Sequence, residues 1–269
     1  MVDSLQKFTI AAGGQNLEAE HHGPRGENAP TIVMLHEGLG SVSAWRDWPA
    51  ELARETGFGV FVFSRAGYGN SDPVKLPRPV SYMHHEGHDV LPEVIAQAGI
   101  RKCILLGHSD GASISILHAG SDACRPEIAG LALLSPHVFC EPESIAGIEQ
   151  SRDAYAKSDL RARLSKHHRD VDNAFWGWNG VWLDPEFRSW NIEDHLPKID
   201  LPILLIQEDR DPYGTLAQVN AIERGVRGST DMLILKGNGH FPHKDCHDET
   251  TSAVVKFARA IFGSHLENG

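Results

Sequence analysis

The sequence has 269 residues, of which 41% are hydrophobic and 23% charged, and this composition excludes a disordered or low-complexity chain. Acidic residues outnumber basic residues by 36 to 25, which gives a formal charge of -11. Because this charge repels phosphate backbones and anionic lipid surfaces, we expect no nucleic-acid partner and no membrane partner.

The N-terminal stretch MVDSLQKFTIAAGGQ lacks the basic start and the continuous apolar segment of a secretory signal. The apolar runs of the chain are far shorter than the roughly 18 to 20 residues that cross a bilayer. We therefore predict a cytoplasmic protein. The four cysteines are widely spaced and form no CxxC pair, so we expect no structural disulfide.

Strand-like and helix-like segments alternate along the chain. A hairpin is predicted over 8–12 and 17–21. Short apolar runs typical of strands covered on both faces follow at 31–35, 60–63, 102–106, 131–134, 203–206 and 232–235. Helices are predicted between them and after them at 45–56, 89–98, 112–119, 215–223 and 249–262. This alternation predicts the α/β class, with a mostly parallel sheet and helices on both of its faces.

One segment interrupts the alternation. Residues 136–197 contain no convincing strand but several helical patterns and four of the six tryptophans. We predict a core of residues 1–135 and 198–269 and a helical lid of residues 136–197 inserted between two strands. Each tryptophan either builds the small core of the lid or lines a pocket at the carboxyl edge of the sheet, where ligands bind in open α/β sheets. The predicted pocket residues of the lid are Trp176, Trp178 and Trp182.

The most specific motif is G-x-S-x-G at residues 107–111, between the strand KCILL and the helix-like ASISILHAG. A serine on a tight turn from strand to helix exposes its Oγ, and the glycines on either side leave room for that turn. Ser109 is therefore the predicted nucleophile, and His108 is expected to border the pocket.

A serine hydroxyl needs a base, and the base needs a carboxylate to orient it. His240 follows the last predicted strand and is the predicted base, with His243 as its rival. The strand PILLI is followed by the candidate acids Glu208, Asp209 and Asp211. Both loops are expected at the carboxyl edge of the sheet, beside Ser109.

With these motifs, nearly the whole chain resembles the α/β-hydrolase family, which has a sheet of the eight-stranded type. In that family the acid follows the opening proline of its strand by nine residues, and counting from Pro202 selects Asp211. The loop HEGLGS at 36–41 resembles the His-Gly oxyanion loop of the family. The resemblance implies the backbone N–H groups of Gly38 and Asp110 as oxyanion donors, with Leu39 as the alternative donor and as a pocket residue.

Sixteen histidines raise the question of a metal site, particularly the run HHEGH at 84–88. Its spacing is not that of a zinc protease helix, where the glutamate is adjacent to the first histidine of an i, i+4 pair. The order of residues in HHEGHD also differs from that of metal-dependent lactonases. We therefore expect neither a metal nor any other cofactor.

The leading functional prediction is a serine hydrolase that cleaves an ester or a lactone of a small to medium substrate through an acyl-enzyme. A serine nucleophile disfavours the dehalogenase and epoxide-hydrolase branches of the family. The loops resemble those of esterases, enol-lactonases and hydrolases of ring-fission products. The alternatives are carbon–carbon bond hydrolysis, a cofactor-free perhydrolase, and a receptor for a small ligand on the same fold. The chain is expected to be a monomer or a homodimer.

Overall fold

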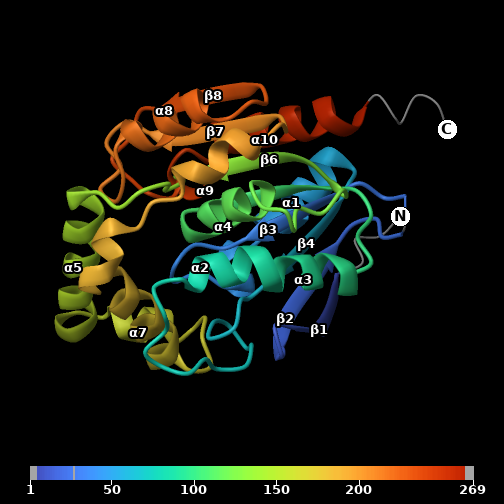
Figure 1. Ribbon diagram of the computed structural model, residues 1–269. Coiled ribbons are helices and arrows are strands. Elements are labelled where there is room, and N and C mark those ends of the chain that lie inside the picture. The colour runs from blue at the N-terminus through green and yellow to red at the C-terminus, as the bar shows by residue number, and fades with distance from the viewer. Residues whose placement is uncertain (1–4, 27, 264–269) are drawn as a thin grey trace.

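An eight-stranded sheet is the centre of the molecule (Figure 1). The computed structural model describes residues 5–26 and 28–263. The order of the strands in the sheet is β1-β2-β4-β3-β5-β6-β7-β8. The strands are β1 Gln6–Ala12, β2 Gln15–His22, β3 Thr31–Leu35, β4 Gly59–Phe63, β5 Cys103–His108, β6 Ile128–Leu134, β7 Ile203–Glu208 and β8 Thr230–Leu235.

The sheet is antiparallel at one edge and parallel elsewhere. Strand β2 pairs antiparallel with both β1 and β4, and the pairs from β4 through β8 are parallel. Every residue of β3, β4 and β5 is buried. These strands are continuous apolar runs because helices cover them on both faces. The carboxyl ends of β5, β7 and β8 lie at one edge, so the loops that follow them meet there.

Helices form a layer on each face of the sheet. One core contains side chains of α3, α4 and α8, and the other contains side chains of α1 and α10. Successive residues of β3 point alternately into the two cores: Val33 and Leu35 into the first, Ile32 and Met34 into the second. The helices named are α1 Trp48–Thr56, α3 Leu91–Gln97, α4 Asp110–Ala119, α8 Leu216–Gly225 and α10 His247–Phe262, and the short α2 Tyr82–His85 and α9 Pro242–Asp245 complete the set.

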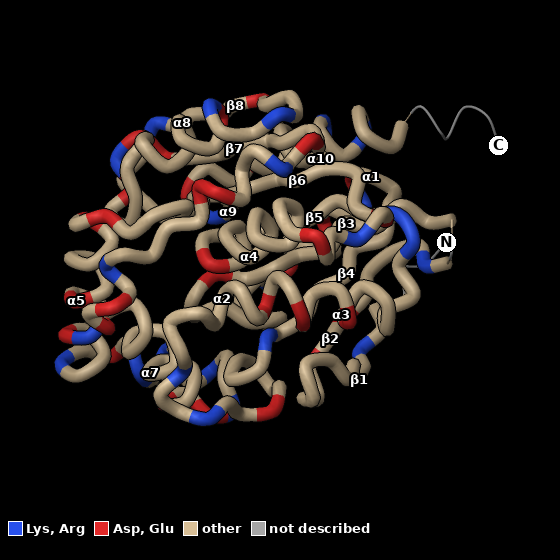
Figure 2. The backbone as a smooth tube through the Cα atoms, viewed as in Figure 1, with Lys and Arg blue, Asp and Glu red and all other residues tan. Residues whose placement is uncertain are grey.

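The chain between β6 and β7 is helical and stands beside the sheet, at the side where α5 and α7 are labelled (Figure 1). One isolated bridge, between Phe139 and Asn191, joins the beginning and the end of this segment. Its helices are α5 Pro142–Lys157, α6 Leu160–Leu164, α7 Val171–Trp182, and the 3-10 turns η3 Pro185–Ser189 and η4 Glu193–Lys198. Acidic and basic residues are interspersed along the chain around α5 and α7 (Figure 2).

The predicted fold class is confirmed; most element boundaries shift by one to three residues, and two predicted helices differ more. The helix predicted over 45–56 is divided into the 3-10 turn η1 Val42–Trp45 and α1, with Arg46 at a positive φ of 55° between them. The helix predicted to begin at 89 belongs to a longer helical run. This run begins with α2, continues through the π-helical turn η2 Glu86–Val90 and ends with α3. All four cysteines are free. None of the described helices has the length and apolar character needed to span a membrane.

Candidate active site

Ser109 occupies a strained turn between β5 and α4. Its φ and ψ are 52° and −117°, a region that residues with a side chain rarely adopt. Its N–H donates to the carbonyl oxygen of Leu134 at 2.9 Å, which fixes the turn to the end of β6. The side chain of Ser109 borders a pocket.

The two glycines of the motif are required by backbone contacts. A Cβ at Gly107 would lie 2.5 Å from the carbonyl oxygen of Gly111, and a Cβ at Gly111 would lie 2.1 Å from that of Leu35. Both distances are below van der Waals contact and involve backbone atoms that have no room to move. The G-x-S-x-G pattern is thus explained by the close packing of α4 against β5 and β3.

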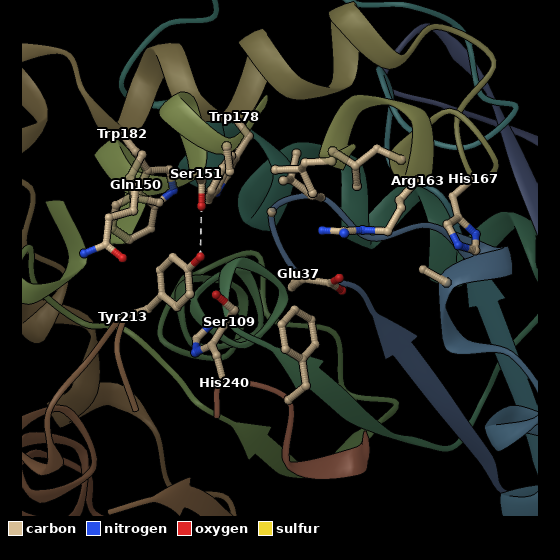
Figure 3. Close-up of a pocket in the computed structure, with 18 of the residues that line it drawn as sticks. Glu37, Ser109, Gln150, Ser151, Arg163, His167, Trp178, Trp182, Tyr213 and His240 are labelled. Atoms are coloured by element: carbon tan, nitrogen blue, oxygen red, sulfur yellow. Dashed lines mark hydrogen bonds between the residues drawn. The ribbon is translucent and has the colours of Figure 1, made fainter. Parts of the chain in front are cut away.

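His240 and Asp211 form a hydrogen-bonded pair next to Ser109. The Nδ1–H of His240 donates to Oδ2 of Asp211 at 2.7 Å. The same carboxylate accepts hydrogen bonds from the backbone N–H of Tyr213 at 2.8 Å and from the side-chain amide of Gln207 at 3.1 Å. Burial acts to raise the pKa of Asp211, but His240 and the Tyr213 N–H lower it overall, so the carboxylate stays ionised. Ser109 and His240 border the same pocket (Figure 3).

The rival acids and the rival base lie elsewhere. Glu208 is buried and accepts a hydrogen bond from the N–H of Gly239 at 2.9 Å, while Asp209 pairs with Lys236 at 2.8 Å. His243 is buried and stacks on Trp48, with ring centroids 5.1 Å apart. Glu208 thus holds the loop that presents His240, and His243 belongs to the core beneath it.

The loop after β3 is held by a buried arginine. The guanidinium of Arg65 donates to the carbonyl oxygens of His36 and Glu37. The backbone N–H of Arg65 donates to Nε2 of His36 at 3.0 Å, and Nδ1–H of that ring donates to the Glu37 carbonyl at 2.7 Å. Gly38 borders the pocket, and a Cβ there would lie 2.0 Å from Nε1 of Trp178. Arg65 is fully buried beneath the loop and supports it from inside the core.

Glu37 places a carboxylate within this loop. Its Oε2 lies 3.7 Å from Nδ1 of His108, and Glu37 borders the pocket. Burial acts to raise the pKa of Glu37, but His108 and Lys244 hold it well below the usual value. The pocket therefore contains a fixed negative charge close to the nucleophile loop.

Asp110, the residue after Ser109, has a fully buried side chain. Its Oδ2 accepts a hydrogen bond from the hydroxyl of Tyr82 and lies 3.8 Å from the guanidinium of Arg65. Its Oδ1 accepts from Nε1 of Trp182 at 3.2 Å. Because Asp110 is the first residue of α4, its backbone N–H has no partner in a preceding helical turn and remains available to a ligand.

The pocket has a volume of about 460 Å³ and lies between the sheet edge and the helices α5 to α7. Of the predicted pocket residues, Leu39, Trp178 and Trp182 line it. Trp176 does not: its side chain is 43% exposed. His108 also lies outside the lining, because its ring is buried behind the site and its Nε2–H donates to the carbonyl oxygen of His240 at 2.6 Å.

Several lining residues were absent from the sequence prediction. Tyr213 packs its ring 4.7 Å from that of His240, and its hydroxyl lies 2.9 Å from Oγ of Ser151 (Figure 3). His137, just after β6, donates from its Nε2–H to the carbonyl oxygen of Tyr213 at 3.0 Å. The sequence did offer one indication that Tyr213 lies at the site, because it follows the predicted acid Asp211 by two positions. The other missed lining residues with polar side chains are Arg46, Ser144, Gln150 and Lys244.

The histidine run is not arranged as a metal site. His84 and His88 lie near His195, with ring centroids 5.6 to 5.9 Å apart. Within residues 5–26 and 28–263, no group of three or more His, Cys, Asp or Glu side chains has the geometry to hold a metal ion.

A parallel sheet with a serine on a strained turn, next to a His–Asp pair, defines a hydrolase of the α/β type. A model of the alpha/beta hydrolase family matches residues 32–253, and the chain belongs to this family. The human serine hydrolase BPHL is 23% identical over 268 residues, covering 94% of this chain and 87% of its own length. Human monoglyceride lipase is 26% identical, covering 90% and 86%. The esterase EaEST from Exiguobacterium antarcticum shares the fold, with a TM-score of 0.75 at 20% identity over 94% of this chain and all of its own.

Proposed function

We propose that this hydrolase is a serine esterase or lactonase that acts on a small to medium substrate through an acyl-enzyme. The observation that supports it most directly is the 2.7 Å hydrogen bond between Nδ1 of His240 and Asp211, next to a serine on a strained turn. This bond fixes the tautomer in which Nε2 of His240 is free to accept a proton. The relatives named as a lipase and as a serine hydrolase are consistent with acyl chemistry.

The proposed reaction has two halves. Oγ of Ser109 attacks the carbonyl carbon, its proton passes to Nε2 of His240, and the carbonyl π-electrons move to the oxygen. The backbone N–H groups of Gly38 and Asp110 stabilise that oxyanion. Collapse of the intermediate breaks the bond to the leaving alkoxide, which takes the proton from His240. A water, deprotonated by the same ring, then cleaves the acyl-enzyme and regenerates Ser109.

The helices of residues 136–197 are proposed as the lid of this site. They contribute Ile148, Leu160, Trp178 and Trp182 to the pocket, and Trp182 is bonded to the residue that follows the nucleophile. A pocket with an apolar wall formed by the lid excludes water from the acyl group, which strengthens the electrostatic interactions made there. In a lactone substrate, the leaving alcohol stays covalently tethered to the acyl chain, and deacylation releases a single hydroxy acid.

The proposal is tested by intact-mass analysis after reaction with a fluorophosphonate. The expected result is a single adduct on the wild-type protein, no adduct on Ser109→Ala, and normal labelling of Ser151→Ala. Ser151 is the matched control because it borders the same pocket but bonds to Tyr213. A panel of 4-nitrophenyl esters, lactones and vinylogous diketones then ranks the bond cleaved. Equal labelling of wild type and Ser109→Ala, or turnover that survives this substitution, contradicts the proposal.

A further inference from the structure

Basic side chains from three separate parts of the chain line the pocket. Arg46 lies between η1 and α1, Arg163 lies on α6, and Lys244 lies on α9. Among the described residues that line it, Glu37 is the one acidic residue. A local excess of positive charge is not expected from the composition of a chain with a formal charge of -11.

Arg46 adopts a strained backbone conformation at this site. Its φ and ψ are 55° and −128°, close to those of Ser109 at 52° and −117°. A side chain makes such a backbone conformation costly, and residues held in it cluster at ligand sites. Glycine would adopt this conformation without the cost. The protein therefore has arginine, with its guanidinium at the border of the pocket, at a position where glycine would avoid the strain.

Among the described residues, neither Arg46 nor Lys244 is part of a salt bridge, although the charge of Lys244 acts on Glu37 across the pocket. In the described part of the chain, no carboxylate lies within 4.0 Å of either side chain. The ammonium of Lys244 lies 4.5 Å from the centre of the Phe241 ring. Arg163 pairs with Asp159, which lies one helical turn before it. The side chain of Arg163 extends into the pocket (Figure 3).

The two charges act on the same group. Burial lowers the pKa of His167, and the positive charges of Lys244 and Arg46 lower it further. His167 borders the pocket and is held by Ser43, whose Oγ lies 2.9 Å from its Nδ1. The side chains of Arg46 and Lys244 thus lie near the same part of the pocket. Their positive charges create a field there that favours an anion.

The rest of the pocket wall is mainly apolar. Its apolar side chains come from the oxyanion loop, the lid and the His240 loop, and include Leu39, Ile148, Leu160, Leu164, Trp178 and Phe241. Such a wall fits a hydrocarbon chain or ring, because removing apolar surface from water is favourable. Cations beside an apolar wall favour an amphipathic ligand with one anionic group.

We propose that the substrate has a free carboxylate in addition to the ester or lactone, and that Arg46 and Lys244, assisted by Arg163, bind this second carboxylate. The inference rests on the proposed acyl hydrolase function and specifies its substrate class. Charge-assisted hydrogen bonds orient the substrate, while Trp178 and Ile148 contact the chain between its two ends. Glu37, which has the opposite charge, disfavours substrates whose anion would lie next to the oxyanion loop.

The test compares two substrates that differ in one charge, mono-4-nitrophenyl adipate and 4-nitrophenyl hexanoate, with spontaneous hydrolysis subtracted. The wild-type protein is expected to hydrolyse the adipate ester with a kcat/KM at least about tenfold higher at low salt, and salt reduces this preference. Arg46→Gln and Lys244→Gln each raise KM for the adipate ester roughly fivefold with little change in kcat, in line with a partly exposed ion pair. Neither changes KM for the hexanoate ester by more than about twofold.

Lys166→Gln is the matched control, because it makes the same change in net charge at an exposed residue that does not line the pocket. It should leave both KM values unchanged. Equal kcat/KM for the two esters, or an equal effect of Lys166→Gln, overturns the inference while leaving an active esterase. Calorimetry of adipate with Ser109→Ala protein separates the two proposals: binding lost in Arg46→Gln supports the anion site even where no ester is cleaved, and absence of binding contradicts it.

Discussion

The indole Nε1–H of Trp182 donates a hydrogen bond of 3.2 Å to the carboxylate of Asp110, so the residue that follows Ser109 is bonded to the helices between β6 and β7. The same carboxylate accepts from Tyr82 and lies 3.8 Å from Arg65, which in turn donates to the Glu37 carbonyl. One buried acid therefore connects α7, α2 and the loop after β3. A side chain without an acceptor oxygen at this position would leave these donors unpaired.

Trp182→Phe tests whether this connection positions the pocket wall. The substitution removes one donor to Asp110 and part of the ring volume, and we expect the free energy of unfolding to fall by about 1 to 3 kcal/mol. KM for a neutral ester should rise more than kcat falls, because the wall is displaced while Ser109 and His240 keep their places. Urea unfolding and steady-state kinetics measure the two effects. Trp176→Phe, at an exposed position, should change neither, and equal effects of the two substitutions would contradict the role given to Trp182.

The strands and the nucleophile turn were predictable because their signals are local. The buried strands β3 and β5 are runs of mostly apolar residues, and the G-x-S-x-G motif is contiguous in the sequence, although Gly111 is required by a contact with the distant Leu35. The choice of Asp211 among three nearby acids depended on a family spacing rather than on the residues themselves. In the structure, the carboxylate of Asp211 is hydrogen-bonded to Nδ1 of His240, which lies 29 positions further along the sequence.

The pocket wall was less predictable because it depends on long-range packing. Trp176 and Trp178 are two positions apart on α7 and point to different surroundings, one exposed and one lining the pocket. Arg46 and Lys244 are far apart in the sequence, in segments without a recognisable motif, and only the fold brings them to one pocket. Helical periodicity alone does not identify which face of an inserted helix meets the site.

His108 is expected to act as a positioning residue through its 2.6 Å hydrogen bond to the His240 carbonyl. His108→Phe leaves that buried carbonyl without a partner, and we expect kcat to fall at least about tenfold, since misplacement of a catalytic group by a fraction of an ångström is costly. His108→Gln places an amide N–H near the position of the imidazole Nε2 and should recover much of the loss. Steady-state kinetics on one ester gives kcat and KM for each variant. A purely structural role for His108 predicts instead that both variants lower thermal stability without separating in kcat.

His118 should make the stability of the protein depend on pH. Its buried ring donates from Nδ1 to the Gly87 carbonyl at 2.8 Å and accepts at Nε2 from the Arg125 N–H at 3.2 Å, so both nitrogens are satisfied only in the neutral form. Burial lowers its pKa from 6.5 to about 4. The unfolded chain therefore binds a proton at higher pH than the folded protein does. Between these two values, stability falls as the pH falls, by on the order of 3 kcal/mol in total from this residue.

The measurement for His118 is the free energy of unfolding in urea at several pH values between 4 and 7, for the wild-type protein and His118→Asn. The asparagine keeps a donor for Gly87 but does not titrate, so its stability should vary less with pH over this window. Other histidines titrate in both proteins, and the difference between the two curves isolates His118. Parallel curves would show that this ring does not contribute.

Gly38→Ala is expected to disable the site while leaving the fold intact. The added Cβ would lie 2.0 Å from Nε1 of Trp178, so either the indole or the oxyanion loop has to move. Displacing one oxyanion donor lowers kcat by about 10² to 10³, whereas thermal unfolding should change little because Gly38 lies in a loop. Trp178→Ala removes the clash, so the double variant should have a higher kcat than Gly38→Ala alone. If Trp178→Ala instead adds its own loss to that of Gly38→Ala, the clash is not the cause and the Gly38 N–H is not the donor that matters.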